Sequence, residues 1–203
     1  IESEDVTEAS APAVFRDIDG IIVPGGFGDR GIEGMINAAR YARENNIPYL
    51  GLCLGMQIAT IEFARNVLGY GDANSNEFDP SSAHKVIDFM KGQSDEIEKG
   101  GTMRLGAYPC VIKTGSMLEK CYGTSEIQER HRHRYEFNND FREEFISHGM
   151  DIVGTSPDHR LVEAVEVSAN RFHIGVQYHP EFKSRPNRAH PLFREFIRAS
   201  LVK

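Results

Sequence analysis

Residues 47–68 pass from a buried strand into a helix with almost no loop between them. Residues 47–52 form a short, continuous apolar run, which is typical of a strand buried on both faces of a parallel sheet. From Leu54 the apolar side chains recur at helical spacing as far as Leu68, and Gly69 is a typical helix stop. A strand that feeds directly into a helix is the building unit of α/β folds.

The same order of elements occurs once before in the chain. Residues 20–23 are a short apolar run, and a glycine-rich loop, residues 24–29, follows it. Beyond the loop the apolar residues fall at helical spacing as far as residue 45, with Asp29 as a candidate N-cap. Two such units in succession imply parallel strands joined by right-handed crossovers.

The second half of the chain consists mainly of short alternating stretches of strand type, some of them expected to be antiparallel. These stretches are residues 108–113, 134–137, 152–155, 161–167 and 172–178. We expect a connector at residues 1–17, loops over residues 72–101, and a final helix that begins at Pro191. The predicted fold is α/β, an open and mostly parallel sheet flanked by helices, with additional antiparallel strands in the second half.

The composition excludes several classes of function. With 23 Lys plus Arg against 30 Asp plus Glu, the 203 residues carry a formal net charge of -7, which argues against a nucleic-acid partner. The longest charge-free apolar stretch, residues 47–61, is shorter than the roughly 20 residues that a bilayer span needs. The 3 cysteines are few and odd in number, which argues against a disulfide framework. We therefore expect a cytoplasmic protein without a membrane partner.

Cys53 lies in the sequence Gly51-Leu52-Cys53-Leu54-Gly55, where the strand turns into the helix. This is the cysteine form of a nucleophile elbow, in which glycines permit the sharp turn and the helix start favours a thiolate. The backbone N–H of Leu54 would lie beside the sulfur, ready to donate to an oxyanion. Most free cysteines are small buried side chains, and we expect that of Cys110 and Cys121.

A base for this nucleophile is available at the end of the stretch 172–178. If the chain stays extended, His179 and Glu181 point to the same side, and the carboxylate can orient the imidazole to complete a Cys-His-Glu triad. A lone His-x-Glu is weak evidence by itself. The loop Gly25-Gly26-Phe27-Gly28 follows the first strand, where ligands bind in α/β sheets, and Gly26 could supply the second oxyanion N–H. A phosphate cradle is disfavoured because neither glycine-rich nucleotide motif is present.

Three segments together resemble the class I glutamine amidotransferases of the triad type. They are PGG at residues 24–26, GLCLGMQ at 51–57 and HPE at 179–181. Four longer segments narrow the resemblance to the glutaminase domains of the CTP synthase family. They are GGFGDRG at 25–31, NSNEFDP at 74–80, GGTMRLG at 100–106 and ERHRHRYEFN at 129–138.

The resemblance implies hydrolysis of L-glutamine through a glutamyl thioester, with Cys53 as nucleophile, His179 as base and then acid, and Glu181 as its orienting partner. The ammonia would aminate ATP-activated UTP to CTP in a synthase domain. The oxyanion donors would be the N–H groups of Gly26 and Leu54. The implied glutamine-binding residues are Gly26, Phe27, Leu54, Gln57, Glu77, Arg134 and Tyr135. A free amino acid carries an ammonium and a carboxylate, so a pocket that offers Glu77 and Arg134 suits it.

The resemblance implies no cofactor and no metal in this domain. ATP and Mg would belong to the synthase domain, GTP would be an activator, and the full-length enzyme would be a homo-oligomer. A run of Arg and His such as residues 130–134 is usually a solvated loop, but its place in the family makes Arg130 and Arg132 candidates for an interface or effector contact. We expect residues 1–203 to be a glutaminase domain that lacks its first strand and helix, without the synthase domain.

Other interpretations remain open on the same fold. One is the glutaminase of another class I amidotransferase, and a second is a cysteine hydrolase of γ-glutamyl peptides. A third is a non-catalytic module, which would not react with an electrophilic glutamine analogue at Cys53.

Overall fold

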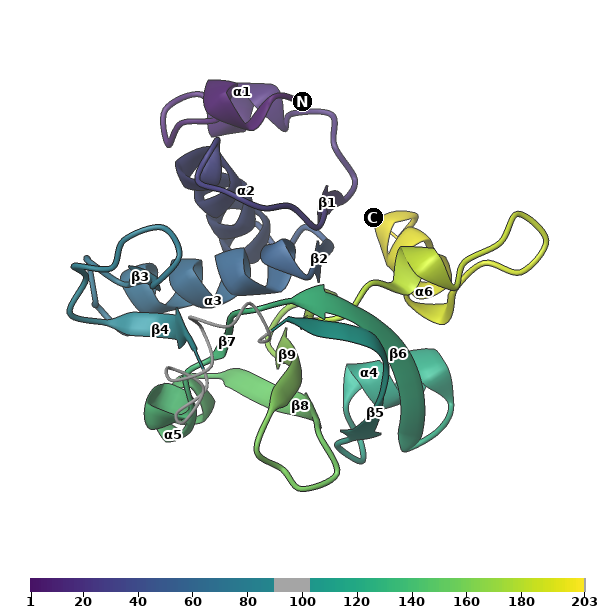
Figure 1. Cartoon of the computed structure of the whole chain (residues 1–203). Helices are drawn as coiled ribbons and strands as arrows, with labels where there is room; N and C mark the ends of the chain where they lie inside the picture. The colour runs from purple at the N-terminus through teal and green to yellow at the C-terminus, as the bar shows by residue number, and fades with distance from the viewer. Residues whose placement is uncertain (90–102, 203) are drawn as a thin grey trace.

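A computed structural model describes residues 1–89 and 103–202 of the chain, so the predicted loop region 72–101 lies partly outside the described residues. Figure 1 shows the arrangement of the elements. The helices are α1 (Ala11–Val14), α2 (Ile32–Glu44), α3 (Leu54–Asn66), α4 (Met117–Tyr122), α5 (Arg142–Ser147) and α6 (Pro191–Ser200), with short 3-10 turns η1 (Ser3–Asp5), η3 (Asn139–Phe141) and η4 (Pro180–Phe182). The strands are β1 (Ile21–Val23), β2 (Tyr49–Leu52), β3 (Asn74–Ser75), β4 (Lys85–Asp88), β5 (Arg104–Ile112), β6 (Glu126–His133), β7 (Glu136–Phe137), β8 (Met150–Thr155), β9 (Val162–Val167) and β10 (His173–Val176).

The main sheet of the described residues has the strand order β1-β2-β10-β9-β8-β5-β6. The pairs β1–β2 and β2–β10 are parallel, and the remaining pairs are antiparallel. The predicted α/β fold with antiparallel strands in the second half is confirmed. The main sheet is mixed rather than mostly parallel, because only the three strands β1, β2 and β10 run parallel to their neighbours in the pairs β1–β2 and β2–β10. The long β5–β6 hairpin curls across the middle of the molecule in Figure 1.

Helices cover both faces of the parallel part of the sheet. Alternate residues of β2 face opposite sides: Tyr49 belongs to the core beneath α2 and α3, whereas Leu50 and Leu52 belong to the core beneath α4 and α6. Helix α3 is buried along almost its whole length and packs closely on the sheet. A Cβ atom on Gly55 would lie 2.1 Å from the carbonyl oxygen of Val23, so only glycine allows this approach.

A small second sheet, β3-β4-β7, lies beside the first. The loop after β3 carries Glu77, and β7 follows directly after Arg134 and Tyr135. Strands β4 and β7 pair antiparallel, with Ile87 opposite Phe137. The small sheet therefore connects the loop of Glu77 to the segment of Arg134 and Tyr135.

The prediction that residues 1–17 form a connector is wrong. This segment forms η1 and α1, and Val6, Ala11 and Phe15 are buried in the same core as α2. Ala11 and Phe15 lie one helical turn apart, but the pattern covers only a single turn, which is too short to predict a helix by itself. Among the described residues, no helix combines the length and the apolar character that crossing a bilayer requires.

The prediction of a strand at residues 134–137 is also wrong in its placement. The strand is β6, which ends at His133, and only Glu136 and Phe137 are paired beyond it, in β7. The basic run is thus largely strand rather than solvated loop. Along β6 the side chains alternate, with His131 and His133 buried and Arg130 and Arg132 exposed.

Candidate active site

Cys53 occupies the turn between β2 and α3, as its flanking glycines predict. Its backbone has φ 50 and ψ -99, in the region that favours glycine, and its N–H donates to the carbonyl of Val176 at 2.7 Å. Its own carbonyl accepts the N–H groups of Met56 and Gln57, which begin the helical turn. The N–H of Leu54, the first residue of α3, belongs to the helix start, where backbone donors lack intrahelical acceptors.

His179 and Glu181 form a hydrogen-bonded pair, with Nδ1 of the imidazole 2.6 Å from Oε1 of the carboxylate. The predicted extended chain is wrong at this point, because η4 begins at Pro180 and Glu181 lies in its turn. The turn still brings the carboxylate to the imidazole. The imidazole also stacks on the ring of Phe182, with 4.9 Å between centroids.

Cys53 and Glu181 both act on the proton affinity of His179. Burial lowers the pKa of His179, but interactions with Cys53 and Glu181 outweigh it and raise the pKa to about 10. Burial raises the pKa of Glu181, and its hydrogen bond with His179 leaves that pKa below its ordinary value. Nε2 of His179 is buried without a partner of good hydrogen-bond geometry among the described residues, so this nitrogen is available to a reacting group.

The glycine-rich loop after β1 closes the site against these residues. A Cβ atom on Gly25 would lie 2.8 Å from Cε1 of His179 and 3.6 Å from Cβ of Cys53. On Gly26 it would lie 3.0 Å from Cδ2 of Leu54. The loop backbone therefore lies close to the imidazole of His179, to Cys53 and to the start of α3, and Gly26 and Leu54 are brought together.

A cavity of about 220 Å³ opens beside Cys53. Its lining residues are Gly26, Phe27, Cys53, Gln57, Glu77, Met103, His133, Arg134 and Tyr135. Six of the seven predicted glutamine-binding residues are in this set, and Leu54 is not. The sequence reasoning missed Met103 and His133, because neither side chain carries a catalytic pattern of its own.

Among the described residues, the cavity is lined by one acidic side chain, Glu77, and by one basic side chain, Arg134. Oε1 of Glu77 accepts the N–H of Gly28 at 3.5 Å. Burial raises the pKa of Glu77, an effect that the Gly28 N–H and the charge of Arg134 partly oppose. Arg134 itself is exposed at the cavity edge. This pair of charges suits a ligand that carries both an ammonium and a carboxylate.

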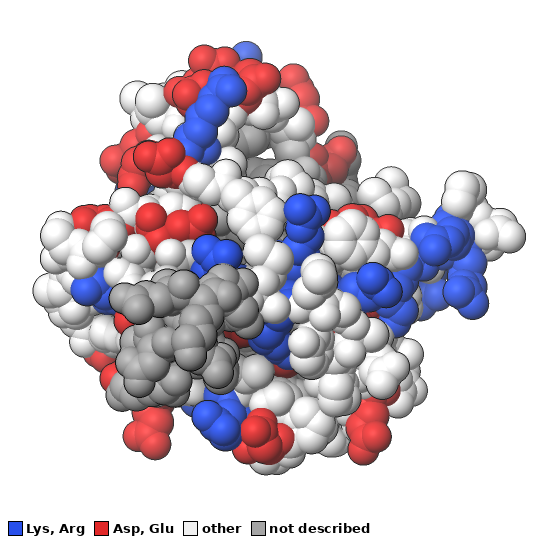
Figure 2. Space-filling view, in the orientation of Figure 1, with Lys and Arg blue, Asp and Glu red and all other residues white. Residues whose placement is uncertain are grey.

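The backbone of β6 contacts both halves of the candidate triad. The carbonyl of Arg130 accepts the N–H of His179 at 2.8 Å, and the carbonyl of Arg132 lies 3.9 Å from Sγ of Cys53. The side chains of Arg130 and Arg132 lie outside the cavity lining, and the guanidinium of Arg132 lies over the ring of Phe27 at 5.6 Å. In Figure 2, Lys and Arg gather in the middle of the visible face and toward α6, whereas Asp and Glu gather over α1 and α2.

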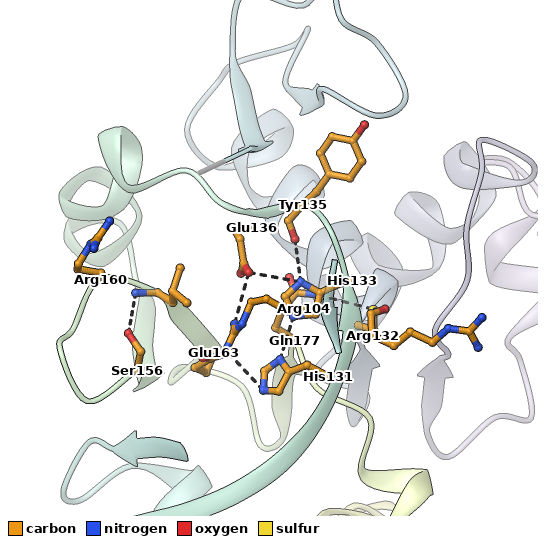
Figure 3. A network of polar contacts seen from close by, with 12 residues as sticks. Arg104, His131, Arg132, His133, Tyr135, Glu136, Ser156, Arg160, Glu163 and Gln177 are labelled. Atoms are coloured by element: carbon orange, nitrogen blue, oxygen red, sulfur yellow. Dashed lines mark hydrogen bonds and ion pairs between the residues drawn. The ribbon is translucent and has the colours of Figure 1, made fainter. Parts of the chain in front are cut away.

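A buried charged cluster lies behind the cavity and was not predicted. Arg104 holds Glu163 at 2.8 Å and Glu136 at 3.4 Å, and His131 and His133 lie against these groups, as Figure 3 shows. Burial raises the pKa of Glu136 to about 8, although Arg104 opposes this. One guanidinium thus faces two carboxyl groups, and the cluster retains a carboxyl proton near neutral pH. Nothing local in the sequence signals it, because its members come from separated strands.

The remaining cysteines behave as buried side chains. Burial raises the pKa of both Cys110 and Cys121 to about 12, so neither is a ready nucleophile. Within residues 1–89 and 103–202, no group of three or more His, Cys, Asp or Glu is arranged to hold a metal ion.

The chain matches a known family over almost its whole length. A family model described as "Glutamine amidotransferase class-I" matches residues 2–199. Proteins named CTP synthase from Staphylococcus aureus strains JH9 and Newman are 58% identical over 201 residues, which are 99% of this chain and 38% of theirs. This chain therefore spans well under half the length of these curated relatives.

Solved structures give a similar result. The glutaminase domain of CTPS from Trypanosoma brucei, with bound acivicin, has 41% sequence identity and a TM-score of 0.94, covering 100% of this chain and 80% of that chain. A putative GMP synthase component from Thermoplasma acidophilum has 17% identity and a TM-score of 0.60, covering 96% of this chain and 79% of that one. The second similarity concerns the fold alone.

Proposed function

The chain belongs to the class I glutamine amidotransferase family, and we propose that it hydrolyses L-glutamine to glutamate and ammonia. The observation that carries the proposal is that the His179–Glu181 pair and the Gly25–Gly26 loop lie close to Cys53, which lines the cavity together with Gly26. The relative solved with acivicin supports a site for a glutamine-like amino acid. Residues 1–203 would act as one glutaminase domain.

Acylation begins with the thiolate of Cys53. The sulfur attacks the side-chain amide carbon of glutamine, and the N–H groups of Gly26 and Leu54 stabilise the oxyanion. Protonated His179 donates its proton to the departing nitrogen, so the C–N bond breaks and ammonia leaves. The high pKa of His179 favours the imidazolium–thiolate pair that this step requires. The product on the enzyme is a glutamyl thioester.

Deacylation uses the same groups in reverse. Neutral His179 takes a proton from water, and the resulting hydroxide attacks the thioester carbonyl. The C–S bond breaks, glutamate leaves and the thiolate of Cys53 is restored. Glu181 keeps the imidazole oriented through Nδ1 in both steps. The sum is glutamine plus water giving glutamate plus ammonia.

Glutamine would be held by the cavity residues. Glu77 pairs with its ammonium and Arg134 with its carboxylate, while Gln57, Phe27 and Tyr135 line the space between. In the full-length enzyme the ammonia would aminate ATP-activated UTP to CTP in a synthase domain, as the name of the Staphylococcus aureus relatives suggests. Arg130 and Arg132 would face that domain or an effector, and the free cysteines suit the cytoplasm.

The proposal is tested with 6-diazo-5-oxo-L-norleucine, an electrophilic analogue of glutamine, and mass spectrometry of the peptides. We expect one adduct, at Cys53, that excess glutamine suppresses and Cys53→Ala abolishes. Cys110→Ala is the matched control and should leave the adduct unchanged. A protein that takes no adduct at Cys53 and releases no ammonia from glutamine would contradict the proposal.

A further inference from the structure

On the basis of the proposed glutamine hydrolysis, we infer that Gln177 is a positioning residue that holds the sulfur of Cys53 as a thiolate and links it to Gln57. Gln177 follows the end of β10 and lies two residues before His179. Its side chain is fully buried, with 0% exposure, so its amide needs internal partners. It is not among the described residues that line the cavity, so its proposed role is exerted through Cys53 and Gln57.

Both ends of the Gln177 amide are occupied. Nε2 donates to Sγ of Cys53 at 3.7 Å, and Oε1 accepts from Nε2 of Gln57 at 3.3 Å. The backbone N–H of Gln177 donates to the carbonyl of Glu163 on β9 at 2.8 Å, which anchors the residue on the neighbouring strand. Two contacts of the side-chain amide and one backbone hydrogen bond therefore fix the position of Gln177.

The orientation of the Gln177 amide follows from its neighbours. Nε2 of Gln57 also donates to the carbonyl of Tyr135 at 3.3 Å, and a backbone carbonyl can only accept. The NH₂ group of Gln57 therefore faces two oxygens, one of which is Oε1 of Gln177. The NH₂ group of Gln177 is left to face the sulfur.

This orientation favours the charged form of the nucleophile. A thiolate accepts hydrogen bonds, whereas a thiol needs an acceptor for its own proton. The carbonyl of Arg132, 3.9 Å from Sγ, is an acceptor and suits the thiol. The NH₂ group of Gln177 suits the thiolate, and so does protonated His179. Removal of the Gln177 donor should therefore move Cys53 toward the less reactive thiol.

The same amide connects the nucleophile to the glutamine pocket. Gln57 lines the cavity, and the Tyr135 carbonyl that it contacts also accepts from Nδ1 of His133 at 3.1 Å, a contact visible in Figure 3. The hydrogen-bond chain runs from Sγ through Gln177 and Gln57 to the cavity wall. Loss of Gln177 would remove one of the two hydrogen bonds of the Gln57 NH₂ group as well as the donor that faces the sulfur.

The test measures the alkylation of Cys53 by iodoacetamide between pH 5 and 10, read by peptide mass spectrometry. Iodoacetamide does not require the glutamine pocket, so the rate reports thiolate content. For Gln177→Met, which keeps the length without the donor, we expect the pH of half-maximal rate to rise and the rate at pH 7 to fall about tenfold. For Gln177→Glu, the new carboxyl group and the neighbouring thiol would each have to ionise beside the charge of the other, so that pH should rise further.

We expect the pH of half-maximal alkylation to increase in the order wild type, Gln177→Met, Gln177→Glu. This order indicates an electrostatic role, because the effect of a purely structural residue would not follow the charge of the replacement. Gln128→Met, at an exposed position of β6, is the matched control and should alkylate as the wild type does. Circular dichroism tests whether each variant is folded. If Gln177→Met does not fold, the comparison of the isosteric Gln177→Glu variant with the wild type decides the role of Gln177.

Folded Gln177 variants with the wild-type pH profile overturn the role of Gln177, whatever happens to glutamine turnover. A wild-type protein that releases no ammonia from glutamine overturns the proposed function instead. The two failures are therefore distinguishable.

Discussion

The imidazoles of His131 and His133 are hydrogen-bonded to one another inside the protein, with Nδ1 of the first 2.8 Å from Nε2 of the second. Nδ1 of His133 donates to the carbonyl of Tyr135, so its Nε2 carries the lone pair that accepts from His131. Burial lowers the pKa of His131 to about 2 and that of His133 to about 3, and Arg104 acts in the same direction. Both rings are therefore neutral, and the wall behind the cavity depends on neutral histidines.

The first prediction concerns Glu136. Its carboxyl has a pKa of about 8 in the fold against 4.5 ordinarily, so between these values the folded state binds a proton that the unfolded chain has lost. Stability from this group is therefore lost as pH rises from about 4.5 to 8. We expect Glu136→Gln to gain stability relative to the wild type through this window, by at most about 1.4 kcal/mol per pH unit.

Urea unfolding at several pH values measures this difference. Glu126→Gln, at an exposed position of β6, is the control and should show a nearly constant difference. A constant difference for Glu136→Gln as well would contradict the assigned proton.

The second prediction concerns His173, whose two ring nitrogens are buried without a hydrogen-bond partner in the part of the chain that the structure describes. Burial, with help from Arg43, lowers its pKa to about 3. Below about pH 6.5, His173 is therefore protonated in the unfolded chain but stays neutral in the folded protein. The folded state loses stability relative to the unfolded state as pH falls from there toward 3. His173→Phe keeps the ring that stacks on Tyr49 at 4.6 Å and should stabilise the protein increasingly below pH 6.5.

Thermal unfolding at pH 7 and pH 5 checks this, and the gain should be larger at pH 5 by roughly 1 to 2 kcal/mol. His148→Gln, at an exposed position after α5, serves as the comparison. An equal gain at both pH values would show that packing alone is responsible.

The third prediction concerns Glu181. Its hydrogen bond is one of the two interactions that raise the pKa of His179, so Glu181→Gln should lower that pKa from about 10. We expect glutamine turnover to fall by about 10- to 100-fold, mainly in kcat, because the imidazole loses its orienting partner. NMR titration of the His179 ring protons, together with steady-state kinetics, measures both effects.

Glu119→Gln, distant on α4, should alter neither quantity. An unchanged His179 titration in folded Glu181→Gln would refute the coupling between the two side chains.

The fourth prediction concerns Gly25. An alanine Cβ there would lie 2.8 Å from Cε1 of His179, so either the imidazole or the loop must shift, and we expect the imidazole to be displaced. We expect Gly25→Ala to remain folded and to lose at least about tenfold in turnover, since catalysis is sensitive to displacements of this size. Gly71→Ala is the matched control, because nothing lies within 4 Å of its added Cβ. Full activity of folded Gly25→Ala would mean that the loop yields without moving His179.

The sequence predicted the first two strand–helix units well, for a physical reason. The turn at Cys53 is encoded locally, by glycines on both sides and by apolar side chains at the two periods of a strand and a helix. The same holds for the pairing of His179 with Glu181, which lie two residues apart. Two side chains this close in sequence can form a hydrogen bond in more than one backbone conformation. The pairing was therefore predicted correctly although the predicted backbone was extended and the observed one turns.

Strand β6 was missed because its inward residues are Glu129, His131 and His133 instead of apolar side chains. Their burial is satisfied by partners such as Arg104 and Glu163 that lie far away in sequence, and no local period encodes them. The contacts of Gln177 could not be predicted for the same reason, because its partners Cys53 and Gln57 are more than 100 residues away in the sequence. Local patterns thus gave the frame of the site, whereas its buried polar lining depends on tertiary contacts.

Strand β6 reaches Cys53 and His179 through the carbonyls of Arg130 and Arg132, not through their side chains. Main-chain atoms are the same in every amino acid, so these two contacts persist through any substitution that preserves the strand. Apart from Arg132, whose guanidinium lies over the ring of Phe27, the outward side chains of β6 are therefore less constrained by the proposed chemistry than its backbone is. These side chains can be remodelled to suit different neighbours at little risk to the groups beneath them.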